Sequence, residues 1–326
     1  MTTTTPMQAF MKRHFRHYNS GETLRAADSW VAHHQQGGKM LVSLAGAMST
    51  AGLGRSLAPL IRAGVVDAVS CTGANLEEDA FLLLACDEYE RIDSWRALRA
   101  SDEAALLARG MNRVTDTCIP ETVMRHLEER LLQQWQQAAE AGTSPTPSQH
   151  LMAVLADPSL RPLFQGDPDD SWLLAAAEAG IPVYTPGWED STTGNMFAAA
   201  AVRGDLPNHH CVATGTEQMQ HLIGWYTQHG GDGVGFFQVG GGIAGDFAIC
   251  AVPLINQDLR RDVPTWAWFC QISDAVTSYG GYSGAVPNEK ITWGKLATDT
   301  PKFMIESDAT LVAPMIFQYV LDSVAG

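Results

Sequence analysis

The sequence predicts an α/β fold, because short apolar runs and longer helix-like segments alternate over most of its 326 residues. This alternation is typical of a largely parallel sheet with helices on its faces. No linker divides the chain convincingly, and no internal repeat is visible. We therefore expect a single Rossmann-like domain over residues 1–326, with a largely parallel sheet flanked by helices and a helical insertion.

The predicted elements begin with a strand at Lys39–Leu44, a short apolar run that ends at Ala45-Gly46. Leucine and isoleucine residues at helical spacing follow and stop near Gly64, which predicts the first helix. A second helix is expected from about Glu77, and a last one over residues 310–324. Further strands are predicted at residues 65–70, 181–185, 234–239, 266–272 and 303–306.

Two regions lie outside this alternation. Residues 1–35 are expected to form an N-terminal helical arm. Residues 87–148 are more polar and richer in Arg, Glu and Gln, which predicts an insertion of surface helices. Within this insertion, residues 128–140 are helix-like, whereas the Gly-, Pro- and Ser-containing stretch 142–148 predicts a loop.

Composition restricts the partners and the compartment. The net charge of -15 disfavours nucleic acid and anionic membrane surfaces, and it favours a cationic small molecule. Six scattered cysteines without a CxxC pair favour a reduced, cytoplasmic chain. We expect no signal peptide and no membrane-spanning segment, because no apolar stretch has the required form or length. His209 and His210 have no third ligand at useful spacing, so no metal site is expected.

A glycine-rich turn follows the predicted strand 234–239. Gly240 to Gly245 match G-x-G-x-x-G between a strand and a helix, where backbone amides can hold a pyrophosphate. The ribose-binding carboxylate expected about 20 residues further on is not evident, because Asp258 and Asp262 fall in a polar loop. The alternative is that the glycines only make a tight strand-to-helix turn.

Acidic residues follow three other predicted strands. Glu77 and Glu78 stand at a predicted helix start, Asp190 follows residue 185, and Asp308 follows residue 306. Ligands in α/β folds bind at the carboxyl ends of the strands, where a carboxylate can hold a ribose hydroxyl or an ammonium group. The alternatives are structural, because acidic residues favour a first helical turn and Asp308 can cap the last helix.

Lys295 is one of five lysines and ends a stretch that contains Glu289, Trp293 and Gly294. Burial of an amine beside a tryptophan favours its neutral form, which can attack an imine or a carbonyl. The alternative is a surface lysine whose stem covers an apolar face.

Together these segments resemble the deoxyhypusine synthase family, and specifically its bacterial deoxyhypusine synthase-like branch. The matching pieces occur in the family's order and cover most of the chain from about residue 41. They are residues 64–67 with 77–79, 181–183 with Asp190, 240–242, 283–285 with 293–295, and 308–312. The Trp-Gly-Lys motif at 293–295, with Ser-Gly-Ala and Pro-x-Glu upstream, is the specific part.

The resemblance implies NAD-dependent transfer of an aminoalkyl group from a polyamine such as spermidine or putrescine. In that chemistry a hydride passes from the carbon beside an amine nitrogen to bound NAD, and the resulting imine exchanges onto the enzyme's lysine. The acceptor amine then displaces the lysine, and the retained NADH reduces the product imine. The motif match implies that Lys295 is the catalytic, imine-forming residue.

The resemblance also implies the binding residues and the assembly. The cofactor-binding positions are Ser49, Thr50, Thr72, Gly73, Ala74, Glu78, Asp190, Gly241, Gly242, Asp274, Ala275, Asp308 and Ala309. The substrate-binding positions are Glu77, Asn195, Asp246, Tyr282, Glu289 and Trp293. NAD sites in the family lie at subunit interfaces of a tetramer, so a homotetramer is implied.

Three positions depart from the eukaryotic pattern of the family, because Asn195 replaces an Asp, Asp246 a His and Tyr282 an Asp. The first change removes an anionic contact and the second adds one. We therefore predict a small amine as acceptor, in a homospermidine synthase-like reaction that starts from putrescine. The alternatives are a deoxyhypusine synthase that modifies a protein lysine, a non-catalytic polyamine- or NAD-binding protein, and an ordinary Rossmann dehydrogenase.

Overall fold

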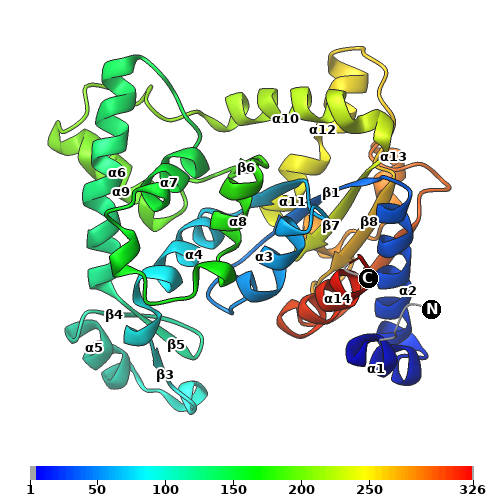
Figure 1. The fold of residues 1–326 in the computed structure, drawn as a ribbon, viewed down its shortest axis with the longest axis horizontal. Coiled ribbons are helices and arrows are strands. Elements are labelled where there is room, and N and C mark those ends of the chain that lie inside the picture. Colours follow the sequence, from blue (N-terminus) through cyan, green and yellow to red (C-terminus); the bar gives the residue numbers. More distant parts are fainter. Residues whose placement is uncertain (1–4, 325–326) are drawn as a thin grey trace.

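A computed structural model describes residues 5–324 of the chain (Figure 1). Its centre is a six-stranded sheet in the order β6-β2-β1-β7-β8-β9, in which all neighbouring strands are parallel. Numbered by appearance within this sheet, the order is 3-2-1-4-5-6, that of a doubly wound dinucleotide-binding fold. The predicted α/β fold class is confirmed.

The strands and helices have defined bounds. The central strands are β1 (Lys39–Leu44), β2 (Ala68–Cys71), β6 (Val183–Tyr184), β7 (Val234–Val239), β8 (Trp268–Ile272) and β9 (Lys302–Ile305). The helices are α1 (Pro6–His14), α2 (Tyr18–Gln35), α3 (Gly54–Arg62), α4 (Gly73–Ala85), α5 (Ala100–Ala108), α6 (Glu121–Ala141), α7 (Pro147–Ala156), α8 (Trp172–Ala179), α9 (Thr192–Arg203), α10 (Gly215–His229), α11 (Gly242–Ile249), α12 (Ala251–Pro253), α13 (Glu289–Thr292) and α14 (Ala309–Val324).

Apolar side chains cover both faces of the central sheet, as a parallel sheet requires. Phe236 and Phe237 are neighbours in β7 and point to opposite faces, because side chains alternate along a strand. On one face Phe237 packs against Trp30 of α2, and on the other Phe236 packs against Trp266. Trp266 also contacts Tyr226 of α10. The two helical layers are visible on either side of the sheet in Figure 1.

The strand predictions hold best where an apolar run begins and ends sharply. β1 and β7 have the predicted bounds. β2 begins at Ala68 rather than at residue 65, because the amide of Val65 still bonds to the carbonyl of Leu60 at 3.0 Å as α3 ends. Gly64 makes that helix end possible with a positive φ of 69°.

Helix α4 begins earlier than predicted. α4 begins at Gly73 rather than near Glu77, because Thr72 accepts a hydrogen bond from the amide of Asn75 at 3.2 Å and so caps the helix. Glu77 and Glu78 therefore lie in the second turn, and the helix-dipole explanation for them is wrong. α9, which begins at Thr192, was not among the predicted helices.

The insertion at residues 87–148 was predicted as helices alone, and this prediction is corrected. A small antiparallel sheet, β3-β5-β4, lies within it, formed by β3 (Glu90–Arg91), β4 (Met111–Val114) and β5 (Thr117–Pro120). These strands have only two to four residues, β3 is exposed, β4 is half-buried and β5 is largely buried, so no apolar alternation marks them. α6 contains the predicted helical stretch, whereas α7 begins at Pro147 inside the predicted loop.

The N-terminal helices α1 and α2 contact α14, and α2 also packs against the β9 side of the sheet (Figure 1). Residues 1–4 of the predicted helical arm lie outside the described residues. Within residues 5–324, no helix combines the length and the apolar character needed to cross a membrane.

Candidate active site

The predicted cofactor-binding residues share one position in the fold. Each follows the carboxyl end of a strand of the central sheet, and all six strands contribute. The residues are Ser49 and Thr50 after β1, Thr72 to Ala74 and then Glu78 after β2, Asp190 after β6, Gly241 and Gly242 after β7, Asp274 and Ala275 after β8, and Asp308 and Ala309 after β9. Because the strands are parallel, these residues lie along one edge of the sheet.

The glycine-rich turn after β7 is shaped for close backbone approach. Gly240 and Gly242 have positive φ values of 74° and 53°, which favour glycine. A Cβ atom on Gly241 would lie 2.2 Å from Ser283 Oγ, so a side chain does not fit there. The amide of Gly242 opens α11 and donates to Ser283 Oγ at 3.1 Å. The turn leads into the start of α11 at this edge of the sheet, and the amide of Gly240 is bonded within the chain as well, to the carbonyl of Ile272 at 2.7 Å.

The loop after β1 is held by Asn75, a residue that was not among the predicted site residues. Its side-chain nitrogen donates to the carbonyl of Gly46 at 2.8 Å, and its oxygen accepts from the amide of Ser49 at 3.0 Å. Ser49 Oγ donates to the carbonyl of Asn75 at 2.7 Å and accepts from Trp172 Nε1 at 3.0 Å. Ser49 is therefore engaged inside the protein and fixes the shape of the loop.

Glu78 is a buried carboxyl group at this edge, and one of its oxygens has no hydrogen-bond partner in the part of the chain that the structure describes. Its side chain is 7% exposed, and Oε2 is buried without a hydrogen-bond partner. Thr50 Oγ1 is also buried without a partner. Burial, followed by the charge of Glu77, raises the pKa of Glu78 to about 7. Because buried polar atoms are normally paired, these two are candidates for ligand contacts.

Glu77 has a different role from its neighbour. Its two carboxylate oxygens accept hydrogen bonds from the amides of Thr192 and Thr193 at 3.0 and 2.7 Å, where α9 begins. Burial raises the pKa of Glu77, and these hydrogen bonds oppose the rise. The geometry therefore gives Glu77 a structural partner at a helix N-terminus.

Glu77, Glu78 and Asn195 line a cavity of about 510 Å³, together with Glu121, Glu128, Arg125 and Arg203. We call this space, with its four glutamates, the acidic cavity. Arg125 bonds to both Glu121 and Glu128, at 2.6 and 2.5 Å. Two predicted substrate-binding residues, Glu77 and Asn195, thus lie here.

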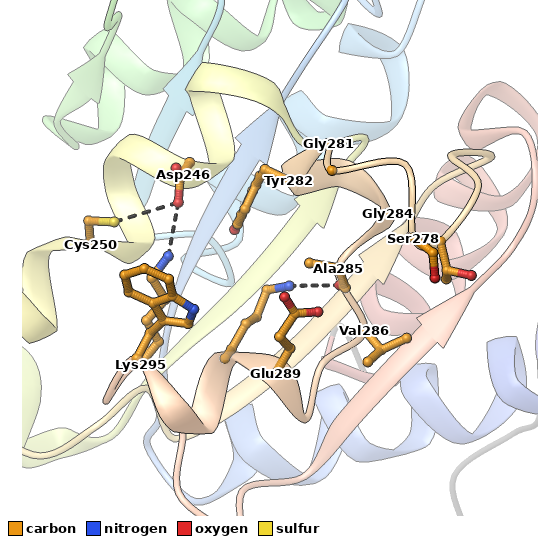
Figure 2. Close-up of a pocket in the computed structure, with 14 residues that line it drawn as sticks. Asp246, Cys250, Ser278, Gly281, Tyr282, Gly284, Ala285, Val286, Glu289 and Lys295 are labelled. Carbon is orange, nitrogen blue, oxygen red and sulfur yellow. Dashed lines mark hydrogen bonds and ion pairs between the residues drawn. The ribbon is translucent and has the colours of Figure 1, made fainter.

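The other predicted substrate-binding residues lie in a second cavity of about 810 Å³ (Figure 2). Its lining contains Lys295 with Asp246, Tyr282, Glu289 and Trp293. We call this space the lysine cavity. It shares no lining residue with the acidic cavity. A single chain therefore brings four of the six predicted substrate positions to the predicted catalytic lysine.

Lys295 is only 6% exposed, so the surface-lysine alternative is wrong. Its Nζ donates to Asp246 Oδ1 at 2.9 Å, and the Asp246 side chain remains 48% exposed to the cavity and solvent. Cys250, on the following turn, lies within 3.5 Å of the same oxygen. Burial raises the pKa of the Cys250 thiol, and the positive charge of Lys295 opposes that rise.

Aromatic rings flank the lysine, but Trp293 is not the group that buries it. Lys295 Nζ lies 5.9 Å from the Trp293 ring, which is 64% exposed, and 5.3 Å from the Tyr282 ring. Tyr282 donates through its hydroxyl to Gln238 Oε1 at 2.8 Å, and burial raises its pKa. Glu289 begins α13 and is exposed toward the same cavity.

Asp190, Asp274 and Asp308 are exposed. Asp308 Oδ1 accepts from the amide of Thr310 at 2.8 Å at the start of α14, so its capping role is present.

Within residues 5–324, no cluster of three His, Cys, Asp or Glu side chains has metal-site geometry.

Comparisons with known proteins indicate the family. The family model described as deoxyhypusine synthase matches residues 9–320. A deoxyhypusine synthase-like protein of Thermosynechococcus vestitus is 30% identical over 290 residues, covering 86% of this chain and 69% of the relative. A second such protein, from Cyanothece sp., is 30% identical over 327 residues, covering 96% and 78%.

Similarity extends to archaeal proteins and to a solved structure. Probable deoxyhypusine synthase 2 of Methanosarcina mazei is 27% identical, covering 85% of this chain and 75% of the relative. A crystal structure from Entamoeba histolytica, described as a deoxyhypusine synthase, superimposes with a TM-score of 0.57 at 15% identity, covering 97% of this chain and 92% of that chain. The structural likeness concerns the fold.

Proposed function

Because the chain belongs to the deoxyhypusine synthase family, we propose that it is an NAD-dependent aminoalkyl transferase that acts on polyamines through an imine on Lys295. The observation that carries this proposal is the buried Lys295, with Asp246 at 2.9 Å and with Glu289 and Trp293 in the same cavity. A buried lysine with a proton acceptor beside it is the arrangement that covalent imine catalysis requires.

The edge of the sheet supports NAD as the cofactor. The start of α11 after the glycine turn suits a pyrophosphate, and the unpartnered oxygens of Glu78 and Thr50 suit ribose hydroxyls. The exposed carboxylates Asp190 and Asp308 complete the set of candidate contacts. NAD, when bound, would accept a hydride from the carbon beside the donor nitrogen.

The chain's own residues would supply the acid–base and binding steps. Asp246 would take a proton from the Lys295 ammonium, and the neutral amine can then attack the substrate imine carbon. Glu289 would pair with the distal ammonium of the donor, and Trp293 would cover its chain. The departing amine leaves as its bond to that carbon breaks, and the substrate fragment then remains on Lys295.

We propose a small amine as acceptor, with putrescine as donor and homospermidine as product. Asp246 supports this specificity, because it adds a carboxylate beside the catalytic lysine where the eukaryotic enzymes have a histidine. We also propose a homotetramer with NAD sites at the subunit interfaces, because the predicted substrate residues of one chain are divided between two cavities. A second copy can bring the acidic cavity of one chain to the lysine cavity of another.

The test is incubation of the full chain with NAD and putrescine, followed by mass spectrometry of the amines. We expect homospermidine without net NADH accumulation, and borohydride should trap a substrate adduct on Lys295. Lys295→Ala should lose both signals, with turnover reduced by roughly three orders of magnitude or more. Lys12→Ala, which removes a lysine of α1 outside both cavities, is the matched control.

Net NADH accumulation without a new amine would instead identify a dehydrogenase. Transfer only to a lysine of an added protein acceptor would identify a deoxyhypusine synthase. Amine binding with no adduct and no product would identify a non-catalytic binding protein.

A further inference from the structure

Lys290 is a second buried lysine in the lysine cavity. It belongs to the short helix α13, is 2% exposed and lines the same space as Lys295. Its Nζ donates to the carbonyl of Ala285 at 3.1 Å, and this contact is the dashed line that ends at the labelled Ala285 in Figure 2. Among the described residues, no carboxylate lies within ion-pair distance of this nitrogen, in contrast to Lys295 with its Asp246. Its positive charge is therefore left unpaired by the protein.

The two lysines share one aromatic ring. Tyr282 has Lys290 Nζ at 5.0 Å and Lys295 Nζ at 5.3 Å from its ring centre, and Phe269 lies 4.9 Å from Lys290 Nζ. An ammonium is attracted to an aromatic face, so these rings hold Lys290 in place without neutralising it.

The formal charges of the lysines and carboxylates that line the lysine cavity sum to zero. Two lysines, Lys290 and Lys295, face two carboxylates, Asp246 and Glu289. Asp246 is already paired with Lys295, so Glu289 is the one carboxylate of this cavity left for a ligand ammonium. A diamine and a triamine differ by one ammonium. Because Glu289 is the one unpaired carboxylate of the cavity, the additional ammonium of the triamine would meet the charge of Lys290.

We propose that Lys290 is a specificity-determining residue that restricts the donor to a diamine, by placing a fixed positive charge where a triamine would carry its additional ammonium. This inference rests on the proposed function, because it assigns a role in binding the amine donor. It concerns a residue outside the predicted catalytic and binding set.

The protonation state of Lys290 is consistent with this role. Burial, followed by the charge of Lys295, lowers the pKa of Lys290 to about 8, and the charges of Glu289 and Asp246 oppose the change. The ammonium form therefore predominates at pH 7. Like charges several ångströms apart in a partly screened site repel by enough to change affinity about tenfold.

The experiment compares the affinities of putrescine and spermidine for the full chain by calorimetry at pH 7, without added NAD so that no turnover occurs. The wild type should bind putrescine more tightly than spermidine. Lys290→Met, which keeps the length of the side chain, should raise the affinity ratio of spermidine to putrescine about tenfold. Lys290→Gln removes the charge but keeps a donor for Ala285, and it should behave in the same way.

Lys290→Arg restores the charge and should restore the wild-type ratio. If Lys290 only holds the turn at Ala285, both neutral variants would weaken the two amines equally, and an unchanged ratio would overturn the inference. Tighter spermidine binding by the wild type would also overturn it. If neither amine binds the wild type, the proposed function fails together with the inference, whereas binding with an unchanged ratio removes the inference alone.

Discussion

Acidic and basic side chains line both the lysine cavity and the acidic cavity, but the two cavities differ in how completely these charged groups are paired within the chain. In the acidic cavity, Arg125 bonds to Glu121 and Glu128, and Glu77 accepts two backbone amides. Glu78 keeps an unpartnered oxygen beside them. In the lysine cavity, Lys295 has one carboxylate and Lys290 has none.

The contrast separates structural charges from charges available to a ligand. A pair that lies wholly within the chain holds elements together, as Glu77 holds the start of α9 to α4. A buried group left unpaired lowers stability, and a ligand that pairs with it can offset that loss. By this criterion Glu78 and Lys290 are the groups without a charged or hydrogen-bonding partner for their free atoms or charge, and they lie in separate cavities of one chain.

We expect the largest effect on catalysis from Asp246→Asn, which keeps the shape of the Asp246 side chain but removes its negative charge. Lys295 then has no adjacent group to take its proton, so we expect kcat to fall about 100-fold. The rate of borohydride-trapped adduct formation at pH 7 measures this step. It should recover in part as pH rises, because hydroxide can take the proton instead.

Asp258→Asn, in the exposed segment after α12, is the matched control and should leave the rate unchanged. An Asp246→Asn rate equal to that of wild type at every pH would show that Asp246 does not assist Lys295.

The lysine cavity could be largely predicted from the sequence because Tyr282, Glu289, Trp293 and Lys295 lie close together in the chain. Only Asp246 had to come from a distant segment, and the glycine motif beside it marked its place. Lys290 was not predicted, because nothing in a single sequence distinguishes a buried lysine from an exposed one. Its burial depends on Tyr282 and on Phe269 of β8.

The acidic cavity could not be predicted to the same extent, because its contacts join distant segments. Glu77 bonds to amides 115 and 116 residues further along the chain, so its structural role was invisible in the local pattern. The small sheet of the insertion was missed because its strands lack apolar alternation. Strands β1 and β7 were predicted correctly because they are continuous apolar runs that end in glycine-containing turns.

A smaller effect is expected from Glu78→Gln, which tests whether the unpaired carboxylate serves the cofactor. The folded-state pKa of about 7 lies above the ordinary value of 4.5, so the folded protein binds more protons between these pH values. Stability therefore falls as pH rises through this window, and the full loss is present above pH 7. Glu78→Gln should remove the loss and raise the free energy of unfolding at pH 8 by on the order of 2 kcal/mol.

The same variant should weaken NAD binding about tenfold, because an amide is a poorer hydrogen-bond acceptor for a ribose hydroxyl than a carboxylate. Thermal melts between pH 5 and pH 8 and titration with NAD measure the two effects. Glu129→Gln, on the exposed side of α6, should change neither. A gain in stability with unaltered NAD affinity would remove Glu78 from the cofactor site.

The smallest effect should come from Asn195→Asp, which tests whether the two cavities meet in the assembled protein. If a neighbouring chain presents Asn195 to the donor, the added carboxylate pairs with an ammonium across the interface. We expect the KM for the donor to fall by about two- to fivefold with kcat unchanged, the size of a partly exposed ion pair. Asn208→Asp, in the exposed loop before α10, adds the same charge elsewhere and should leave KM unaltered. A change in NAD affinity in place of the donor KM would assign Asn195 to the cofactor and would keep the two cavities functionally apart.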